Sequence, residues 1–341
     1  MSRPTVHDIA EEAGVSLATV DRVLNERPGV RRKTIDKVCA AAERLGYVRD
    51  TSAANLAKQR QYRFAFILPD GQSQFIDALE STLNEAASYN IAERTVVATI
   101  RVPQRDPHAI VRTLRGLDTE AIDGIALMVP ETPQVRDAVA RLKEAGLGIV
   151  ALVSDLPNSQ RDYFLGVNSV AAGRTAAQLM GRFAQQAGEI LVVTNSIHSR
   201  DSLERRVGFD EVIAAEFPHL TVLPSVEAYD DPHRMRRILE QVLSNRRHLT
   251  GIYSVGSGNS ALLNHLRSHA RQGELHVIAH ELTPATYQAL AKNEIAAVIA
   301  HNVGHLIRGA LRVLRSLCDG LPIYEAQERA RIEIFLRENL P

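Results

Sequence analysis

The sequence predicts two folds in one chain: a small all-α domain at residues 1–49 and a larger α/β body at residues 62–341, joined by a linker at residues 50–61. Three observations support this division. Residues 5–47 place apolar side chains at the three- and four-residue spacing of short helices. Residues 62–341 alternate apolar runs of strand length with helical patterns. The length of 341 residues also exceeds what one hydrophobic core usually supports.

Composition and charge narrow the class of protein. Apolar residues make up 45% of the chain and charged residues 23%, as in globular proteins. The formal net charge is zero, but residues 1–61 hold eleven Lys or Arg against eight Asp or Glu, an excess of three positive charges. A basic N-terminal block is a weak indication of a phosphate-binding module.

Several motifs are missing from the sequence. The N-terminus lacks the apolar core of a secretory signal, and no run of about 18 apolar residues is long enough to cross a membrane. We therefore expect a cytoplasmic protein with no membrane contact. The two cysteines, Cys39 and Cys318, show no zinc-ligand spacing, so we expect no metal and no cofactor. Cys39 falls on the apolar side of a predicted helix, where we expect a small core residue.

The first predicted helix begins at a capping box formed by Thr5 and Asp8. Gly14 fits the left-handed turn that ends it. Four apolar residues fall on one face of this helix: Val6, Ile9, Ala10 and Ala13.

A second helix starts after Ser16, which can cap it, and runs to about Asn25, before the Arg-Pro-Gly break at residues 27–29. Its exposed side is expected to hold Leu17, Ala18, Asp21 and Arg22, and its buried side Val20, Val23 and Leu24. A third helix covers roughly residues 33–45. Its apolar side is expected to hold Ile35, Val38, Cys39, Ala42 and Leu45.

Two short helices joined by a tight glycine turn, with a third packed across them, fit a helix-turn-helix. A three-helix bundle with no role in DNA binding fits the same spacing, so the spacing alone leaves both interpretations open.

Residue identities favour the first interpretation. Five motifs are informative: Asp8-Ile9-Ala10, Ala13-Gly14-Val15-Ser16, Thr19-Val20-x-Arg22-Val23-Leu24-Asn25, Lys33-Thr34 and Leu45-Gly46-Tyr47. This long, ungapped run resembles the N-terminal signature of the LacI/GalR family of bacterial repressors. The resemblance implies a DNA-binding domain whose second helix lies in the major groove of double-stranded operator DNA.

By this resemblance, Leu17, Ala18 and Arg22 occupy base-reading positions, and the Arg22 fork suits the O6 and N7 atoms of guanine. Phosphate-contacting positions are occupied by Thr5, Ser16, Thr19, Asn25 and Thr34. The chain departs from the family at Asp21, where Ser is usual. It also departs at Arg31 and at residues 49–50, which leaves the operator sequence open.

Residues 50–60 form a weak helix or a flexible linker when considered alone. The resemblance implies a hinge helix, with Leu56 at the position of an apolar wedge that enters the minor groove. A helix this short is marginal in water, so it is expected to fold only on DNA. A plain tether remains the alternative.

The body contains nine apolar runs of strand length: residues 64–68, 96–101, 124–129, 148–153, 189–194, 221–226, 251–255, 275–279 and 296–300. Nine helical patterns accompany them: residues 75–89, 106–117, 134–145, 171–187, 201–216, 232–244, 257–272, 284–292 and 304–317. This alternation predicts parallel sheets covered by helices, and nine strands suit two sheets better than one.

The family resemblance implies how these sheets are arranged. By this resemblance, the body is similar to a bilobed α/β effector domain of the periplasmic-binding-protein type I kind. In such a domain the chain crosses between the lobes three times. We expect these crossings near Phe164, Ala300 and Tyr324. The N-lobe is then residues 62–164 and 301–324, and the C-lobe residues 165–300 and 325–341.

Polar residues follow several predicted strands, and the carboxyl ends of parallel strands are where ligands bind in such sheets. Each of these residues, Ser257 included, also fits a simple helix cap or turn. The resemblance places effector-binding positions at Asp155, Asp201, Arg205, Ser257, Glu281 and His301. Asn259 can replace the amide that is usual at Ser257, and Phe75 can stack on an apolar sugar face.

The predicted ligand is a small polyhydroxylated molecule: a neutral sugar, a polyol or a sugar acid. Carboxylates and amides suit vicinal hydroxyls, and Asp155 and Glu281 oppose a strongly anionic effector, whereas Arg205 and the histidines favour one. The sequence therefore predicts a transcriptional regulator, with repression as the expected mode, that acts as a homodimer. A small-molecule-binding protein without DNA function is the alternative. An α/β enzyme is disfavoured because no catalytic motif is present.

Overall fold

The computed structural model describes residues 4–24, 27–47, 60–71, 73–89, 94–256, 258–269 and 272–341. The chain divides into two compact units, Met1–Arg60 and Gln61–Pro341. Three predicted site residues, Asn25, Leu56 and Ser257, lie outside the described residues.

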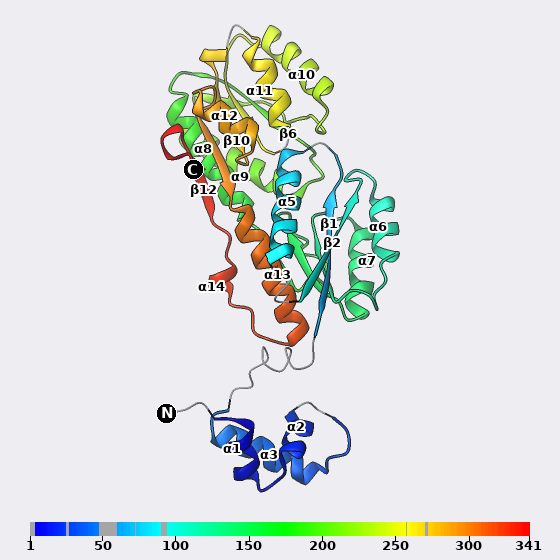
Figure 1. Cartoon of the computed structure of the whole chain (residues 1–341). Coiled ribbons are helices and arrows are strands. Elements are labelled where there is room, and N and C mark those ends of the chain that lie inside the picture. Colours follow the sequence, from blue (N-terminus) through cyan, green and yellow to red (C-terminus); the bar gives the residue numbers. More distant parts are fainter. Residues whose placement is uncertain are drawn as a thin grey trace. The chain divides into compact units, whose positions relative to one another are not determined.

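The N-terminal unit contains the three predicted helices (Figure 1). They are α1 (Val6–Ala13), α2 (Leu17–Leu24) and α3 (Arg32–Arg44). The Thr5 backbone N–H donates to the Asp8 carboxylate at 2.7 Å, which forms the capping box of α1. Gly14 ends α1 with φ +64°, a conformation that favours glycine. The Thr19 N–H then donates to the Ser16 hydroxyl at 3.3 Å, so Ser16 caps α2.

A small apolar core holds these helices together. Its buried members are Ile9, Ala10, Ala13, Val20, Val23, Val38 and Ala41. The prediction that Cys39 is a core residue is wrong, because its side chain is exposed. The prediction that Ile35 is buried is also wrong, since it is 36% exposed. Short helices bury only a narrow stripe, and Cys39 lies about 100° around α3 from the buried Val38.

The second unit contains two sheets. The five-stranded sheet has the order β2-β1-β3-β4-β5, and all of its strand pairs are parallel. Its strands are β1 (Tyr62–Pro69), β2 (Thr95–Val102), β3 (Gly124–Leu127), β4 (Gly148–Leu152) and β5 (Tyr163–Leu165). The short strand β5 is missing from the nine predicted runs, because three residues with one buried side chain give no clear apolar pattern.

The seven-stranded sheet has the order β12-β11-β10-β9-β6-β7, with β8 also paired to β6. Its strands are β6 (Gly188–Thr194), β7 (Leu220–Val222), β8 (Val226–Glu227), β9 (Leu249–Ser254), β10 (His276–His280), β11 (Ala297–His301) and β12 (Ile332–Phe335). Only β12 runs antiparallel among these described pairs. The run predicted at residues 221–226 is divided into β7 and β8, because Pro224 between them has no N–H for a strand ladder.

Helices cover both faces of each sheet, so each sheet is the middle layer of three. Helices α5 and α13 cover one face of the first sheet, and α6 and α7 cover the other (Figure 1). Helices α8 and α9 cover one face of the second sheet, and α10, α11 and α12 cover the other. Their bounds are α5 (Gln74–Tyr89), α6 (Pro107–Arg115), α7 (Pro133–Glu144), α8 (Ser169–Phe183), α9 (Arg200–Glu216), α10 (Pro232–Asn245), α11 (Asn259–Arg267), α12 (Pro284–Ala291) and α13 (Val303–Asp319).

The chain passes between the two lobes three times. It leaves the first sheet after β5, returns between β11 and α13, and leaves again through the short helix α14 (Glu325–Glu328) before β12. None of the helices that the structure describes is long and apolar enough to span a bilayer.

Both sheets repeat one topology, since β6, β7, β9, β10 and β11 follow the same relative order as β1 to β5. In this arrangement the strand order reverses beside the first strand of each sheet, between β1 and β3 and between β6 and β9. Ligands bind outside the carboxyl ends of strands at such points.

Candidate functional site

Helix α2 presents the predicted DNA-contacting side chains to solvent. Leu17 is 42% exposed, and Ala18, Asp21 and Arg22 are also exposed. Val20 and Val23 face the core of the domain. The exposed face of α2 therefore carries the side chains that the resemblance assigns to DNA contacts.

The four predicted phosphate-contacting residues that the structure describes lie near the starts of the helices. Thr5 caps α1, and the Ser16 and Thr19 hydroxyls lie 2.9 Å apart at the start of α2. Thr34 lies in the first turn of α3. Helix N-termini favour anions, so these positions suit phosphate groups. Asp21 forms an ion pair with Arg27 at 3.4 Å, which offsets part of the carboxylate charge on this surface.

A cavity of about 60 Å³ lies in the body at the carboxyl ends of strands from both sheets. The described lining residues include Pro69, Asp70, Ser73, Phe75, Ile76, Gln104, Met128, Val153, Asn195, Ser199, Asp201, Ser202, Arg205, Asp230, Gly256 and Glu281. Four of the predicted effector-binding residues are among them: Phe75, Asp201, Arg205 and Glu281.

Arg205 is the central cation of this site, and its side chain is 2% exposed. Its Nη1 donates to the Val255 carbonyl at 2.7 Å, and its Nη2 donates to Glu281 Oε1 at 3.3 Å. The Asp201 carboxylate lies 3.9 Å from Nη1, one turn earlier on α9. The guanidinium is therefore neutralised from two sides within the protein.

The neighbours of Arg205 in sequence explain its position. Gly208 lets α9 approach α8 closely, because a Cβ there would lie 2.1 Å from the Val170 carbonyl oxygen. Phe209 stacks on Tyr253 of β9 with ring centroids 4.4 Å apart. These two contacts fix α9 against its sheet and point Arg205 at the cavity.

Burial controls protonation in this cluster. It raises the pKa of Glu281 to about 7, although the neighbouring Arg205 guanidinium opposes that rise. Burial also lowers the pKa of His301 to about 3 and lowers the pKa of His280 well below its ordinary value. Both histidines are therefore neutral at pH 7.

Three non-glycine residues that line the site, Val153, Asp230 and Glu281, have a left-handed backbone. Val153 has φ +65° and Glu281 has φ +70°, and each directly follows the last residue of a strand, β4 or β10. This conformation is costly, above all for a β-branched residue, and such residues concentrate at functional sites.

The remaining predicted residues have other contacts. His301 packs edge-on against Phe75 at 5.3 Å and lines an adjoining cavity instead. The Asn259 amide accepts from the Ser254 hydroxyl at 2.7 Å and donates to the His280 carbonyl at 2.8 Å. Both ends of that amide are thus used to join strand ends, and Asn259 lines an adjoining cavity of about 400 Å³ together with Phe75 and Glu281.

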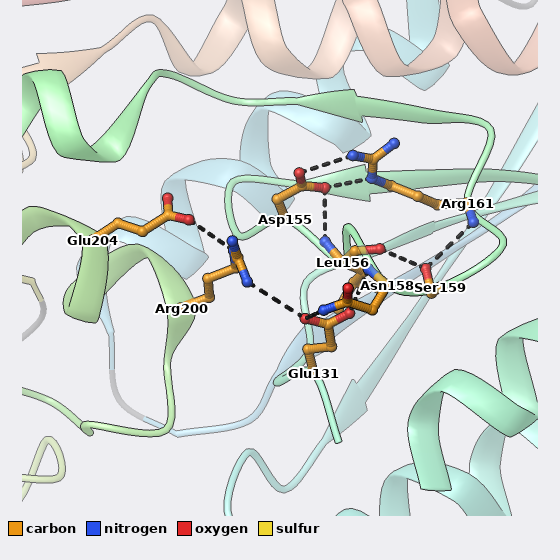
Figure 2. Close-up of polar contacts among 8 residues, drawn as sticks. All are labelled: Glu131, Asp155, Leu156, Asn158, Ser159, Arg161, Arg200 and Glu204. Carbon is orange, nitrogen blue, oxygen red and sulfur yellow. Dashed lines mark hydrogen bonds and ion pairs between the residues drawn. The ribbon is translucent and has the colours of Figure 1, made fainter. Parts of the chain in front are cut away.

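The Asp155 carboxylate points at Arg161 (Figure 2). Arg161 binds it through two nitrogens, with Nη2 2.8 Å from Oδ2, and the Leu156 N–H donates to it at 2.7 Å. Asp155 is absent from the described residues that line the cavity. Arg161, six residues later in the sequence, thus holds the Asp155 carboxylate within the loop that contains both residues.

Several lining residues were not predicted. Gln104 follows β2, Ser199 and Ser202 lie beside Asp201, and Asp230 follows β8 with φ +54°. Ser202 and Asp201 precede Arg205 by three and four residues. Residues at this spacing share one face of a helix, so their place beside Arg205 could have been predicted from the sequence. Asp230 lies in an irregular loop that no spacing pattern marks.

The fold and the site define a two-lobed binding protein with a helix-turn-helix domain at its N-terminus. A model of the periplasmic binding protein domain matches residues 64–322, and a model of bacterial regulatory proteins of the lacI family matches residues 5–50. The chain belongs to the periplasmic binding protein domain family, and its N-terminal domain matches the lacI family of bacterial regulatory proteins.

Named relatives agree with this assignment. The HTH-type transcriptional regulator pepR1 of Lactobacillus delbrueckii subsp. lactis is 24% identical over 76% of each chain. Catabolite control protein A of Priestia megaterium is 29% identical over 47% of this chain and 48% of that protein. The ribitol operon repressor of Klebsiella aerogenes is 24% identical over 57% and 70%. The aligned part thus spans between about half and three quarters of these relatives.

Solved structures resemble the body. A solute-binding protein of Burkholderia graminis in complex with D-arabinose has a TM-score of 0.73, 22% identity and coverage of 82% of this chain and 96% of that chain. GanP, a glucose-galactose binding protein of Geobacillus stearothermophilus, has a TM-score of 0.72, 15% identity and coverage of 83% and 99%. The predicted fold class is confirmed. The prediction that the chain is no enzyme agrees with the curated relatives, which are transcriptional regulators.

Proposed function

We propose that the chain is a cytoplasmic transcriptional regulator, with repression as its expected mode, whose affinity for operator DNA is controlled by a small polyhydroxylated effector. The observation that supports this most directly is the combination of two features in one chain. An exposed recognition-type helix precedes a body with a polar cavity at converging strand ends. A homodimer is proposed because paired helix-turn-helix domains bind half-sites about one helical turn apart.

In DNA binding, α2 enters the major groove. Arg22 contacts a guanine edge, and Leu17 and Ala18 contact neighbouring bases. Phosphates are contacted by Thr5, Ser16, Thr19, Asn25 and Thr34. Leu56 acts as the apolar wedge in the minor groove, and Asp21 limits non-specific attraction to phosphates.

In effector binding, Phe75, Asp201, Arg205 and Glu281 surround a sugar, a polyol or a sugar acid. The D-arabinose complex of the Burkholderia graminis protein and the name of the ribitol operon repressor support this ligand class.

The test begins by selecting duplexes from a random pool with the full-length chain. We expect a pseudo-palindromic consensus. A truncated chain of residues 61–341, one of the two compact units, is expected to lose all binding to that consensus. It is also expected to keep the thermal shift that sugars and polyols cause in the full-length chain. No enriched sequence, together with intact sugar binding, would favour the binding protein without DNA function.

A further inference from the structure

The cavity has an excess of acidic side chains. Among the described residues that line it, four are carboxylic acids, Asp70, Asp201, Asp230 and Glu281, and one is a permanent cation, Arg205. A ligand that bears its own negative charge enters the field of these carboxylates at short range, where the effective dielectric constant is low.

Arg205 offsets only part of this excess for a ligand, because its charge already faces the Asp201 and Glu281 carboxylates. Its two terminal nitrogens contact the Val255 carbonyl and the Glu281 carboxylate, and Asp201 lies on the same side. An anionic ligand at this guanidinium therefore has to compete with two buried carboxylates.

The histidines near the site also add no positive charge. His301 contacts Glu281 at 3.5 Å and is 5% exposed, and His280 shares a 2.8 Å hydrogen bond with the Tyr253 hydroxyl. Burial lowers the pKa of both imidazoles, so they remain neutral at the pH of a cell.

Other cations around the cleft are held elsewhere. Arg200 forms ion pairs with Glu131 and Glu204 (Figure 2). Arg105 and Arg234 lie over the ring of Tyr229, at 4.7 and 4.5 Å from its centroid. None of these three arginines is among the described residues that line the cavity.

We propose that the cavity selects a polyhydroxylated ligand without an anionic group and rejects sugar acids and sugar phosphates. Hydroxyl groups of a neutral sugar donate to the carboxylates, whereas a carboxylate or phosphate on the same skeleton meets like charge. This inference rests on the proposed function and narrows its ligand class to neutral sugars, polyols and their amine derivatives.

The test is calorimetric titration of the full-length protein at pH 8 with matched probes. The sets are glucose, glucuronate and glucose 6-phosphate; galactose and galacturonate; and ribose, ribitol and ribose 5-phosphate. For any skeleton that binds, we expect the charged member to bind at least about tenfold more weakly than its neutral parent. A charged member that binds as tightly as its parent, or more tightly, overturns the inference.

The titrations distinguish failure of the charge selectivity from failure of the proposed effector class. If only sugar acids or sugar phosphates bind, the selectivity for uncharged ligands is overturned, but a polyhydroxylated effector remains. If no member of any set binds, the proposed effector class itself is wrong, and the selectivity for uncharged ligands is wrong with it.

Variants locate the effect in the cavity. The double change Asp201→Asn with Glu281→Gln removes two charges with little change in shape, and we expect it to bring the affinity ratio of acid to neutral parent towards one. Asp155→Asn removes a carboxylate outside the cavity and serves as the matched control, with an unchanged ratio. If the double variant does not fold, the exposed Asp70 allows Asp70→Asn, which should move the ratio in the same direction. An unchanged ratio in the cavity variants, or an equal change in Asp155→Asn, contradicts the inference.

Discussion

At the scale of single residues, Glu281 combines three unusual properties. It is 5% exposed, it has a left-handed backbone, and burial raises its pKa to about 7. The charged and titratable groups that face it are Asp201 and Arg205 from α9 and His301 from β11. The carboxyl therefore holds a proton in the folded protein at a pH where the unfolded chain has already released it.

This property predicts a pH-dependent effect of Glu281→Gln. Between about pH 4.5 and 7 the folded state binds a proton that the unfolded state lacks, so the contribution of Glu281 to stability falls as pH rises through that window. Glutamine has no such contribution. We expect the unfolding free energy of the variant, relative to the unchanged protein, to increase from pH 5 to pH 8. Urea denaturation at several pH values measures it, and a constant difference would refute the raised pKa.

Arg22 gives a second prediction at this scale. Arg22→Ala should relax the preference at one base position and cost about 1–3 kcal/mol in binding to the selected duplex. Arg44→Ala removes the same charge from α3, where Arg44 pairs with Glu12 at 3.1 Å, and is the control. Arg44→Ala should weaken binding to every DNA sequence by about the same factor, so the base preference should not change. An unchanged base preference in Arg22→Ala would rule out the base-reading role.

The sequence predicted some site residues well and others poorly, for physical reasons. Arg205 was expected in the site because the family resemblance places an effector-binding position there, and it does line the cavity. Asp155 was expected in the cavity by its position after a strand, yet Arg161 holds it in its own loop. A single sequence does not show which of two nearby charges a carboxylate will pair with, because that depends on loop conformation.

At the scale of elements, the contact between α8 and α9 determines where the ligand-facing side of α9 lies. Two glycines permit it: a Cβ at Gly173 would lie 1.9 Å from the Arg205 carbonyl oxygen, and one at Gly208 would lie 2.1 Å from that of Val170. Both obstacles are backbone atoms, so neither can be avoided by a change of rotamer.

Gly208→Ala should therefore destabilise the body by about 1–3 kcal/mol, as overpacking does, and weaken effector binding by moving α9. Gly273→Ala is the matched control, because nothing lies within 4 Å of a Cβ at that position. Thermal denaturation and effector titration measure both effects. Equal stability of the two variants would contradict the close-approach explanation.

The presence of helices and strands was predicted more reliably than the shortest strands and the burial of single side chains. Every predicted helix of the body has a counterpart in the structure, because long apolar periodicity marks them. Strand β5 was missed, and β8 was merged with β7 into one predicted run, because two or three residues give too little pattern. The exposure of Cys39 was missed because apolar spacing does not show how narrow the buried stripe of a short helix is.

At the scale of the whole body, an ion pair joins the two lobes beside the cavity. Arg200 of α9 contacts Glu131, which follows β3 in the other lobe, at 3.6 Å, and Glu204 of its own helix at 2.7 Å (Figure 2). The Asn158 N–H donates to Glu131 at 2.8 Å and holds that carboxylate in place. The pair forms only when the lobes are close together, so it favours closure.

Glu131→Gln should shift the body towards open lobes and weaken effector affinity by about two- to fivefold, the range expected of a partly exposed ion pair. Glu204→Gln removes the partner of Arg200 within α9 and leaves the contact between lobes, so it is the control and should change affinity less. Effector titration compares the two variants. An equal or larger loss in Glu204→Gln would show that the contact between lobes is unimportant.

The central proposal is that effector and operator bind to one chain and influence each other. The most direct test measures the operator dissociation constant with and without saturating effector, and the effector dissociation constant with and without saturating operator. Because coupling between two sites is reciprocal, we expect both constants to change by the same factor, about 5- to 150-fold. Binding of both ligands with a factor of one would contradict control of DNA binding by the effector.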